Sequence, residues 1–481
     1  MSGAPELLRR VARETTLFAG FQALATVLVA VSNLLLARVL DVRSFGIFAV
    51  CTLCIGVGSL LGDGGLGATL LRRRGEVSDQ ELRTVFTFVL GVGVALGAGL
   101  YLAAPTLARR YHLHGDELPA LRASAVLLLA GPLRVVPYLR LERALQLSLV
   151  ARIELLATLV RQGMAVLLAL SGVGVWALLV AHALGAATQV GLAWWCAPGW
   201  TGFGGSFTVL KGLLSYGVRV QGLGVLAFLK DNISALFLGP LFGPEAVGLF
   251  DFGVKYAQIP VLAVNALGRV QLPVYARLDP HDPALHGALR GTTRMAFLVG
   301  LPVLVAMTVA APAVVPWLYA PRWLESLPVI QGLALNMAGG LLAGPLFVFL
   351  QAQGHAGLAL RVFLAWTAGT WALALALSGY GIGAVAWAQS ACTVAVVLGL
   401  LRWAERWTGR SLSGALVVPL GAACAASAWG WLSRGLLGPL PSALGAVLVY
   451  LLVLLALERQ ALAEEARSLL SALTSRGHGQ R

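Results

Sequence analysis

Charged residues are scarce in this chain of 481 residues. Asp, Glu, Lys and Arg together make up 12% of it, whereas 58% of the residues are hydrophobic. Soluble domains average about 25% charged and about 45–50% apolar residues. A water-soluble fold could not hide so much apolar surface, so the composition excludes a soluble globular protein and predicts one that lies in a lipid bilayer.

The chain also lacks the usual motifs of catalysis. It has no GxSxG nucleophile motif and no Walker lysine, and its seven histidines show no metal-ligand spacing with carboxylates. Gly62–Gly67 satisfies GxGxxG, but no βαβ unit surrounds it. The five cysteines are scattered, so we expect no disulfide framework. We therefore expect neither an enzyme nor a bound cofactor.

What the chain has instead is a series of fourteen apolar stretches of membrane-crossing length. A hydrocarbon layer about 30 Å thick needs about 20 helical residues, and continuous apolar runs without alternation favour helices over strands. The sequence therefore predicts an all-α polytopic membrane protein. The stretches are 16–36, 45–61, 85–103, 121–136, 155–170, 175–194, 213–238, 247–266, 296–315, 328–350, 362–377, 382–400, 416–431 and 444–457.

The basic residues are distributed unevenly between the two sides of the predicted membrane. The formal net charge is +14, and most of the 35 Lys and Arg fall in segments on the side that holds the N-terminus. Because basic segments stay in the cytoplasm, this distribution predicts that both termini are cytoplasmic. The positive charge then has anionic lipid headgroups as its partner, and no nucleic acid is expected.

Two parts of the sequence repeat each other. The first stretch ends in Asn33 followed by an apolar run, and the seventh ends in Asn232 in the same way; Phe45-Gly46 and Val247-Gly248 then open the next stretches. Six stretches separate the copies, so both have the same orientation, as in transporters built from parallel repeats. We expect a six-helix lobe at 1–197, an inter-lobe loop at 198–210, a second lobe at 211–401, and two more helices at 402–481.

Buried charge gathers in the seventh stretch. Arg219 and Lys230 are three helical turns apart and share a face, and Asp231 and Asn232 adjoin the second cation. Two cations on one face within the membrane suit an anionic ligand, and guanidinium groups suit phosphate oxygens. Alternatively, Arg219 lies near the cytoplasmic end and extends its side chain to the headgroups.

The eighth stretch carries a polar stripe. Its members, at helical spacing, are Asp251, Lys255, Gln258, Asn265 and Arg269. The stripe indicates a face that meets a polar space or protein. An ion pair between the aspartate and the lysine one turn apart is an equally good interpretation.

Weaker candidates lie in the first lobe. Glu154, Thr158 and Arg161 share one face of the fifth stretch, and because the glutamate could reach the arginine, a structural role is favoured. Asn33 and Gln22 in the first stretch are uncharged and more often form hydrogen bonds between helices.

Four segments resemble the lipid-linked oligosaccharide flippases of the multidrug/oligosaccharidyl-lipid/polysaccharide superfamily. They are 64–74 with 83–86, 172–178, 247–260 and 268–278. The resemblance implies a V-shaped pair of six-helix lobes. It also implies a flippase that moves polyprenyl-diphosphate-linked oligosaccharide to the periplasmic leaflet by alternating access, for O-antigen, capsule or exopolysaccharide export. Arg219, Lys230, Lys255 and Arg161 are then the candidates for holding the diphosphate.

Such a protein implies certain partners and sources of energy. Its partners would be the lipid-linked glycan, membrane lipids, a polysaccharide polymerase and export machinery, and an H⁺ or Na⁺ gradient could drive it. A cation-coupled multidrug exporter of the same superfamily is the alternative, but acidic residues should dominate its interior. A membrane polymerase or glycosyltransferase fits less well because every predicted outward loop is short.

Overall fold

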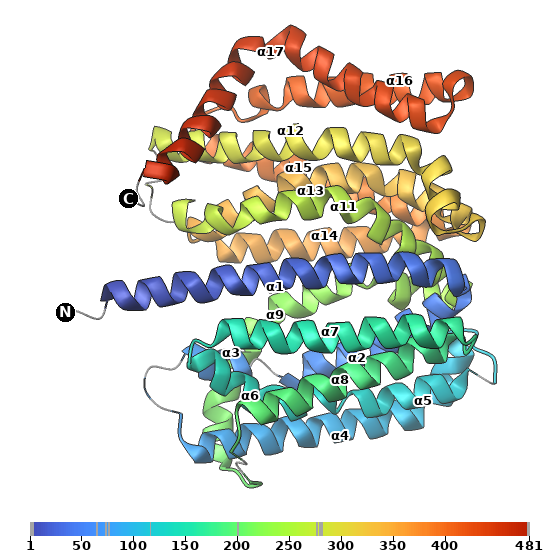
Figure 1. Cartoon of the computed structure of the whole chain (residues 1–481), viewed down its shortest axis with the longest axis vertical. Coiled ribbons are helices and arrows are strands. Elements are labelled where there is room, and N and C mark those ends of the chain that lie inside the picture. The colour runs from blue at the N-terminus through green and yellow to red at the C-terminus, as the bar shows by residue number, and fades with distance from the viewer. Residues whose placement is uncertain are drawn as a thin grey trace. The chain divides into compact units, whose positions relative to one another are not determined.

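The computed structural model of the chain describes residues 4–478 except 64–65, 73–74, 76, 116, 200–201, 276–277 and 279–281. Side chains are described for fewer residues, leaving out also 4–12, 62–63, 68, 72, 215–223, 262–270, 272–274, 356 and 460–478. Every regular element in the described residues is a helix (Figure 1). The helices are α1 (Ala4–Val39), α2 (Val42–Asp63), α3 (Leu66–Arg72), α4 (Asp79–Arg110), α5 (Leu118–Leu127), α6 (Ala130–Arg143), α7 (Leu147–Leu170), α8 (Val175–Cys196), α9 (Phe207–Asp231), η1 (Ser234–Leu238), α10 (Gly239–Phe242), α11 (Pro244–Tyr275), α12 (Pro283–Val314), η2 (Val315–Tyr319), η3 (Pro321–Ser326), α13 (Leu327–Ala352), α14 (Ala356–Leu377), η4 (Ser378–Tyr380), α15 (Ile382–Thr408), η5 (Ser413–Ala415), α16 (Val417–Leu437) and α17 (Pro439–His478).

The all-α membrane architecture predicted from the sequence is confirmed. Each of the predicted apolar stretches lies in one helix or in two consecutive helices. By length and composition, 11 helices in the described residues could cross a membrane, or 12 if one bent pair is a single span. The total of fourteen spans stays a prediction.

The chain divides into two compact units, Met1–Asp251 and Phe252–Arg481. The predicted lobes at 1–197 and 211–401, the loop at 198–210 and the C-terminal pair at 402–481 stay predictions.

In the first unit, α1 packs along α7 and α7 packs along α8 (Figure 1). Leu36 of α1 is buried in a cluster with small side chains of its neighbours, among them Ala165 of α7 and Ala181 of α8. Small residues let helix backbones approach closely, which is how helices associate where lipid supplies no hydrophobic driving force. Together with α6, these three helices line the site described below.

The fourth predicted span is made of two helices. α5 ends at Leu127 and α6 begins at Ala130. Pro132 has no N–H to donate, and its ring would clash with the carbonyl of Leu128 in a continuous helix. The break follows from this proline, and it brings the start of α6 against α4, where Pro132 would contact a Cβ placed on Gly93 at 2.7 Å.

The seventh predicted span is bent. The segments Gly224–Asp231 and Ser234–Phe242 meet at 59°, and the second one starts as the π-helix η1. Asn232 ends α9 by donating both its backbone N–H and its side-chain amide to the Phe228 carbonyl, at 3.0 and 2.9 Å. Pro240 cannot continue the helical ladder. π-helical turns and broken spans are frequent at functional sites of membrane proteins.

The two copies of the sequence repeat contact each other where α2 and α11 begin. A Cβ added to Gly46 would lie 1.7 Å from the Pro244 carbonyl oxygen, and one added to Gly248 would lie 2.4 Å from that of Val42. The contact is reciprocal, as between two equivalent elements. Only glycine permits this approach, so a steric reason accounts for the glycine that both copies of the repeat share.

A charged cluster lies next to this contact. Arg43 donates to both carboxylate oxygens of Glu117, at 2.6 and 2.7 Å, and to Glu245 at 2.6 Å. Glu117 also accepts from the backbone N–H of His114 at 2.7 Å. Burial raises the pKa of Glu117, but the hydrogen bonds from Arg43 and His114, with the arginine's charge, outweigh it and hold that pKa below its usual value.

In the second unit, α12 packs against α13, α16 and α17, while α13 packs along α15. A single large cluster of buried apolar residues, which includes Tyr275, Phe349 and Tyr450, joins these helices. Arg294 of α12 forms a bidentate ion pair with Glu458 of α17, at 3.0 and 2.5 Å. The two C-terminal helices are therefore part of this unit's core.

Candidate functional site

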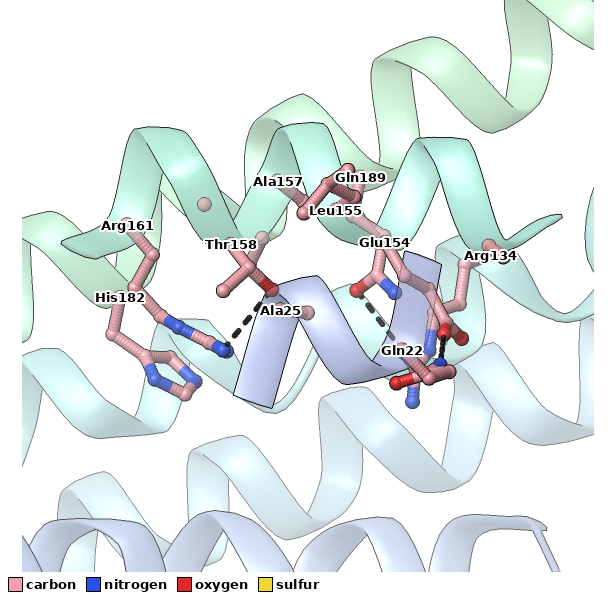
Figure 2. Close-up of a pocket in the computed structure, with 13 residues that line it drawn as sticks. Gln22, Ala25, Arg134, Glu154, Leu155, Ala157, Thr158, Arg161, His182 and Gln189 are labelled. Carbon is pink, nitrogen blue, oxygen red and sulfur yellow. Dashed lines mark hydrogen bonds between the residues drawn. The ribbon is translucent and has the colours of Figure 1, made fainter. Parts of the chain in front are cut away.

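A polar cavity lies inside the first unit, within its membrane-spanning helices. Its volume is about 260 Å³, and its lining residues come from α1, α6, α7 and α8 (Figure 2). They are Gln22, Ala25, Arg134, Ala151, Glu154, Leu155, Ala157, Thr158, Arg161, His182, Gly185, Ala186 and Gln189. Because polar side chains at membrane depth are costly, a cavity lined by two arginines and a glutamate is a functional candidate.

One end of the cavity holds two sets of hydrogen bonds, one between α1 and α7 and one between α6 and α8. Gln22 of α1 donates to Glu154 of α7 at 2.5 Å. Arg134 of α6 donates to the Gln189 side-chain oxygen of α8 at 3.0 Å, and Gln189 donates to the Tyr138 hydroxyl at 2.8 Å. Figure 2 shows Gln22, Glu154, Arg134 and Gln189 gathered there. Glu154 and Arg134, one anion and one cation, are thus each held by a neutral amide partner.

The other end of the cavity holds a second cation. The Arg161 guanidinium points toward Thr158, at a hydrogen-bond distance of 3.5 Å, and lies near His182 (Figure 2). His182 packs edge-on against Phe48, with ring centroids 6.1 Å apart. A Cβ on Gly185 would lie 2.7 Å from Arg161 Cβ, so a glycine of α8 provides the room for this side chain.

The contacts of Arg161 correct one interpretation of the sequence. The expected structural pairing of Glu154 with Arg161 does not occur among the ion pairs within 4.0 Å in the described residues. Glu154 instead accepts from Gln22, and the long contact to Thr158 is weak by hydrogen-bond criteria. Arg161 thus keeps donors directed into the cavity. An anionic group would supply acceptors for them.

The other predicted site residues lie elsewhere. Asn33 is half-buried outside the lining of the cavity. Lys230 forms an ion pair with Asp231 at 2.6 Å, and Asn232 caps α9, as described above. These three residues lie at the bend of the seventh span, so the structure brings them together, but at a place other than the cavity.

The polar stripe of the eighth span is only partly described. Asp251 accepts a hydrogen bond from Ser234 of η1, and Lys255 and Gln258 are exposed. The side chains of Arg219, Asn265 and Arg269 lie outside the described residues. The stripe and the seventh span therefore meet at Asp251 and Ser234, which places the aspartate beside the bend.

Sequence reasoning missed Arg134, His182 and Gln189. Arg134 stands near the end of its predicted stretch, 121–136, where an arginine is expected to reach the headgroups, although the span continues to Arg143. His182 and Gln189 are seven residues apart, two turns on one face of α8, and this spacing was a usable signal. No sequence signal placed them opposite α6 and α7, because that depends on how the helices pack.

In the residues that the structure describes, no group of three or more His, Cys, Asp or Glu could hold a metal ion. The lining of the cavity offers guanidinium, carboxylate, amide, hydroxyl and imidazole groups.

Comparisons with known proteins agree with this architecture. The chain is 25% identical over 355 residues to the teichuronic acid biosynthesis protein TuaB of Bacillus subtilis (strain 168), covering 73% of this chain and 71% of the relative. It is 22% identical to the lipopolysaccharide biosynthesis protein WzxC of Escherichia coli (strain K12), covering 66% of each. It is 24% identical to the succinoglycan biosynthesis transport protein ExoT of Rhizobium meliloti (strain 1021), covering 63% of this chain and 61% of that one.

Solved structures show the same fold. The lipid II flippase MurJ, in an inward closed conformation, matches with a TM-score of 0.72 and 13% identity, over 93% of this chain and all of that chain. An inward-facing multidrug resistance MATE family transporter of the MOP superfamily matches with a TM-score of 0.60 and 16% identity, over 80% of this chain and 94% of that one. The family described as polysaccharide biosynthesis protein matches residues 35–328. The chain belongs to this family of polysaccharide biosynthesis proteins.

Proposed function

We propose that the protein is a flippase that moves a polyprenyl-diphosphate-linked oligosaccharide from the cytoplasmic to the periplasmic leaflet of the bacterial inner membrane. The observation that carries the proposal is the membrane-embedded cavity with two arginines in its lining. The family and the names of the relatives support transport of a glycan precursor rather than enzymatic synthesis.

The cavity suits a diphosphate physically. A guanidinium group donates several hydrogen bonds in a planar fork that matches phosphate oxygens. Arg134 and Arg161 lie on different helices at the two ends of the cavity, so an anion between them would meet donors from both sides (Figure 2). Gln22, Thr158 and Gln189 offer polar groups to the first sugar, while the prenyl chain stays in lipid.

A cation-coupled drug exporter fits the cavity less well. Two arginines oppose one glutamate in the lining, so a cationic drug would be repelled. The similarity to the MATE family transporter therefore concerns the fold and does not extend to the substrate.

Orientation and partners complete the proposal. The basic residues favour cytoplasmic termini. A polysaccharide polymerase and export machinery would act on the glycan after it has crossed.

The test is transport of a fluorescent diphosphate-linked sugar lipid in proteoliposomes, read as accessibility of the label on the far leaflet. We expect Arg134→Ala and Arg161→Ala each to slow transport about 10- to 100-fold, because each removes charge-assisted hydrogen bonds worth about 1.5–3 kcal/mol.

Arg361→Ala is the matched control, since Arg361 is an exposed arginine of α14. Its rate should equal that of the wild type. Wild-type rates in both cavity variants, with equal amounts of protein in the vesicles, would contradict the proposal. Elongation of the glycan during the assay would instead indicate a polymerase.

A further inference from the structure

Glu154 is the one acidic side chain among the described residues that line the cavity. Its carboxylate accepts from Gln22 at 2.5 Å, and neither cavity arginine lies within ion-pair distance of it. Arg134 is close enough to interact with its charge but is bound to Gln189. The carboxylate is thus held in place by a neutral amide, which can also hold a protonated carboxyl group after a change of hydrogen-bond direction.

The charges of the cavity depend on this one proton. Arg134 and Arg161 stay positive at every pH of interest. With Glu154 ionised and His182 neutral, the lining carries one net positive charge; with Glu154 protonated, it carries two. A diphosphate diester carries two negative charges. Protonation of Glu154 therefore matches the lining to the proposed substrate, and ionisation leaves a carboxylate facing the bound phosphates.

Among the residues whose side chains are described, the titratable or charged groups near Glu154 belong to the packed helices already named. α6 contributes Arg134, Glu142 and the hydroxyl of Tyr138, α7 contributes Arg161, and α8 contributes His182. α1 faces Glu154 with the neutral Gln22. Glu142 interacts electrostatically with Glu154 but lies outside the lining. Glu142 is therefore the other nearby carboxylate at which a proton can bind.

We propose that anion binding in this cavity is linked to uptake of a proton by Glu154. The inference rests on the proposed function. The proton comes from water when the diphosphate binds and returns to water when it leaves, and no covalent bond forms. By linkage, the protonated cavity binds the anion more tightly, and the bound anion favours the protonated carboxyl group to the same extent.

The experiment measures binding of a water-soluble probe to the detergent-solubilised full chain. The probe is a diphosphate diester with a short prenyl chain and one sugar, whose phosphates keep the same charge between about pH 5 and pH 8. Above the pH at which Glu154 ionises in the free protein, wild-type affinity should fall by up to about tenfold per pH unit. Calorimetry in buffers of different ionisation enthalpy should report uptake of up to about one proton per probe.

Variants identify the carboxylate that takes up the proton. Glu154→Gln keeps an amide beside Gln22 and should bind the probe with an affinity that is tight and independent of pH. Glu142→Gln and the exposed Glu325→Gln should keep the wild-type slope. The wild-type calorimetry needs no variant, so the inference stays testable even if Glu154→Gln folds poorly.

The outcomes separate the inference from the proposed function. Binding without proton uptake, or a pH slope that survives in Glu154→Gln or disappears in Glu142→Gln, would overturn the role of Glu154 and leave the flippase proposal standing. Absence of probe binding to the wild type at any pH would contradict the proposed site itself, and the inference with it.

Discussion

At the scale of single residues, hydrogen bonds decide what each charged group in this protein can do. Arg43 and Glu117 satisfy each other with two short hydrogen bonds, and the side chains are largely buried, with 21% and 12% exposed. Arg161, by contrast, has only a long contact to Thr158 and lines a cavity. The same residue type is structural in the first place and available to a ligand in the second.

The Arg43 cluster predicts a dependence of stability on pH. The pKa of Glu117 in the folded protein lies below its ordinary value of 4.5. The stabilisation that ionised Glu117 gives the folded protein is therefore complete above pH 4.5, and it is lost as the pH falls through the lower pKa of the folded state.

We expect thermal unfolding in detergent to show this loss below about pH 4.5, amounting to at most about 1 kcal/mol because Glu245 of the cluster is half exposed. Glu117→Gln should be less stable than the wild type at neutral pH, and it should lose less stability than the wild type on acidification. A variant that loses as much as the wild type would show that other carboxylates dominate the acid response.

At the scale of helices, close approach and buried ion pairs fix the packing. The contact of α2 with the start of α11 depends on Gly46 and Gly248, whose added Cβ atoms would meet backbone oxygens rather than side chains that can move aside. The ion pair between α12 and α17 is likewise enclosed, with 6% of the Arg294 side chain and 14% of the Glu458 side chain exposed.

Gly248→Ala should destabilise the protein by about 1–3 kcal/mol, because the backbone of α2 must move to admit one methyl group. Gly421→Ala in α16 is the matched control, since nothing lies within 4 Å of its added Cβ. It should be neutral or slightly stabilising, because alanine favours a helix over glycine. The measurement is thermal unfolding in detergent, and equal stability of the two variants would refute the steric account.

Arg294→Met should destabilise the second unit by about 3–5 kcal/mol, because it leaves the Glu458 carboxylate without its partner in a largely buried place. The double variant Arg294→Met with Glu458→Leu should recover most of this loss. Thermal unfolding of both variants provides the measurement. A double variant as unstable as the single one would mean that the pair itself, rather than the uncompensated charge, stabilises the packing of α17.

At the scale of the whole molecule, the positions of the helices along the chain were more predictable than the site. The apolar stretches located the helices because a membrane requires the same length and composition of every span. The short repeat gave a register in which Arg43 and Glu245 are equivalent, 202 residues apart, and the structure joins these two side chains directly. The break in the fourth span follows from Pro132, which was visible but unused in the sequence.

The sequence by itself determined that this protein is a bundle of membrane helices, because apolar composition and run length leave a bilayer no other solution. It also indicated Arg161 as a cation at membrane depth. Only the tertiary structure decided what surrounds that cation. Arg134, Gln189 and His182 reach the same cavity from α6 and α8, and Gln22 rather than Arg161 binds Glu154, because contacts between helices depend on their rotation and packing, which the spacing within one helix does not specify.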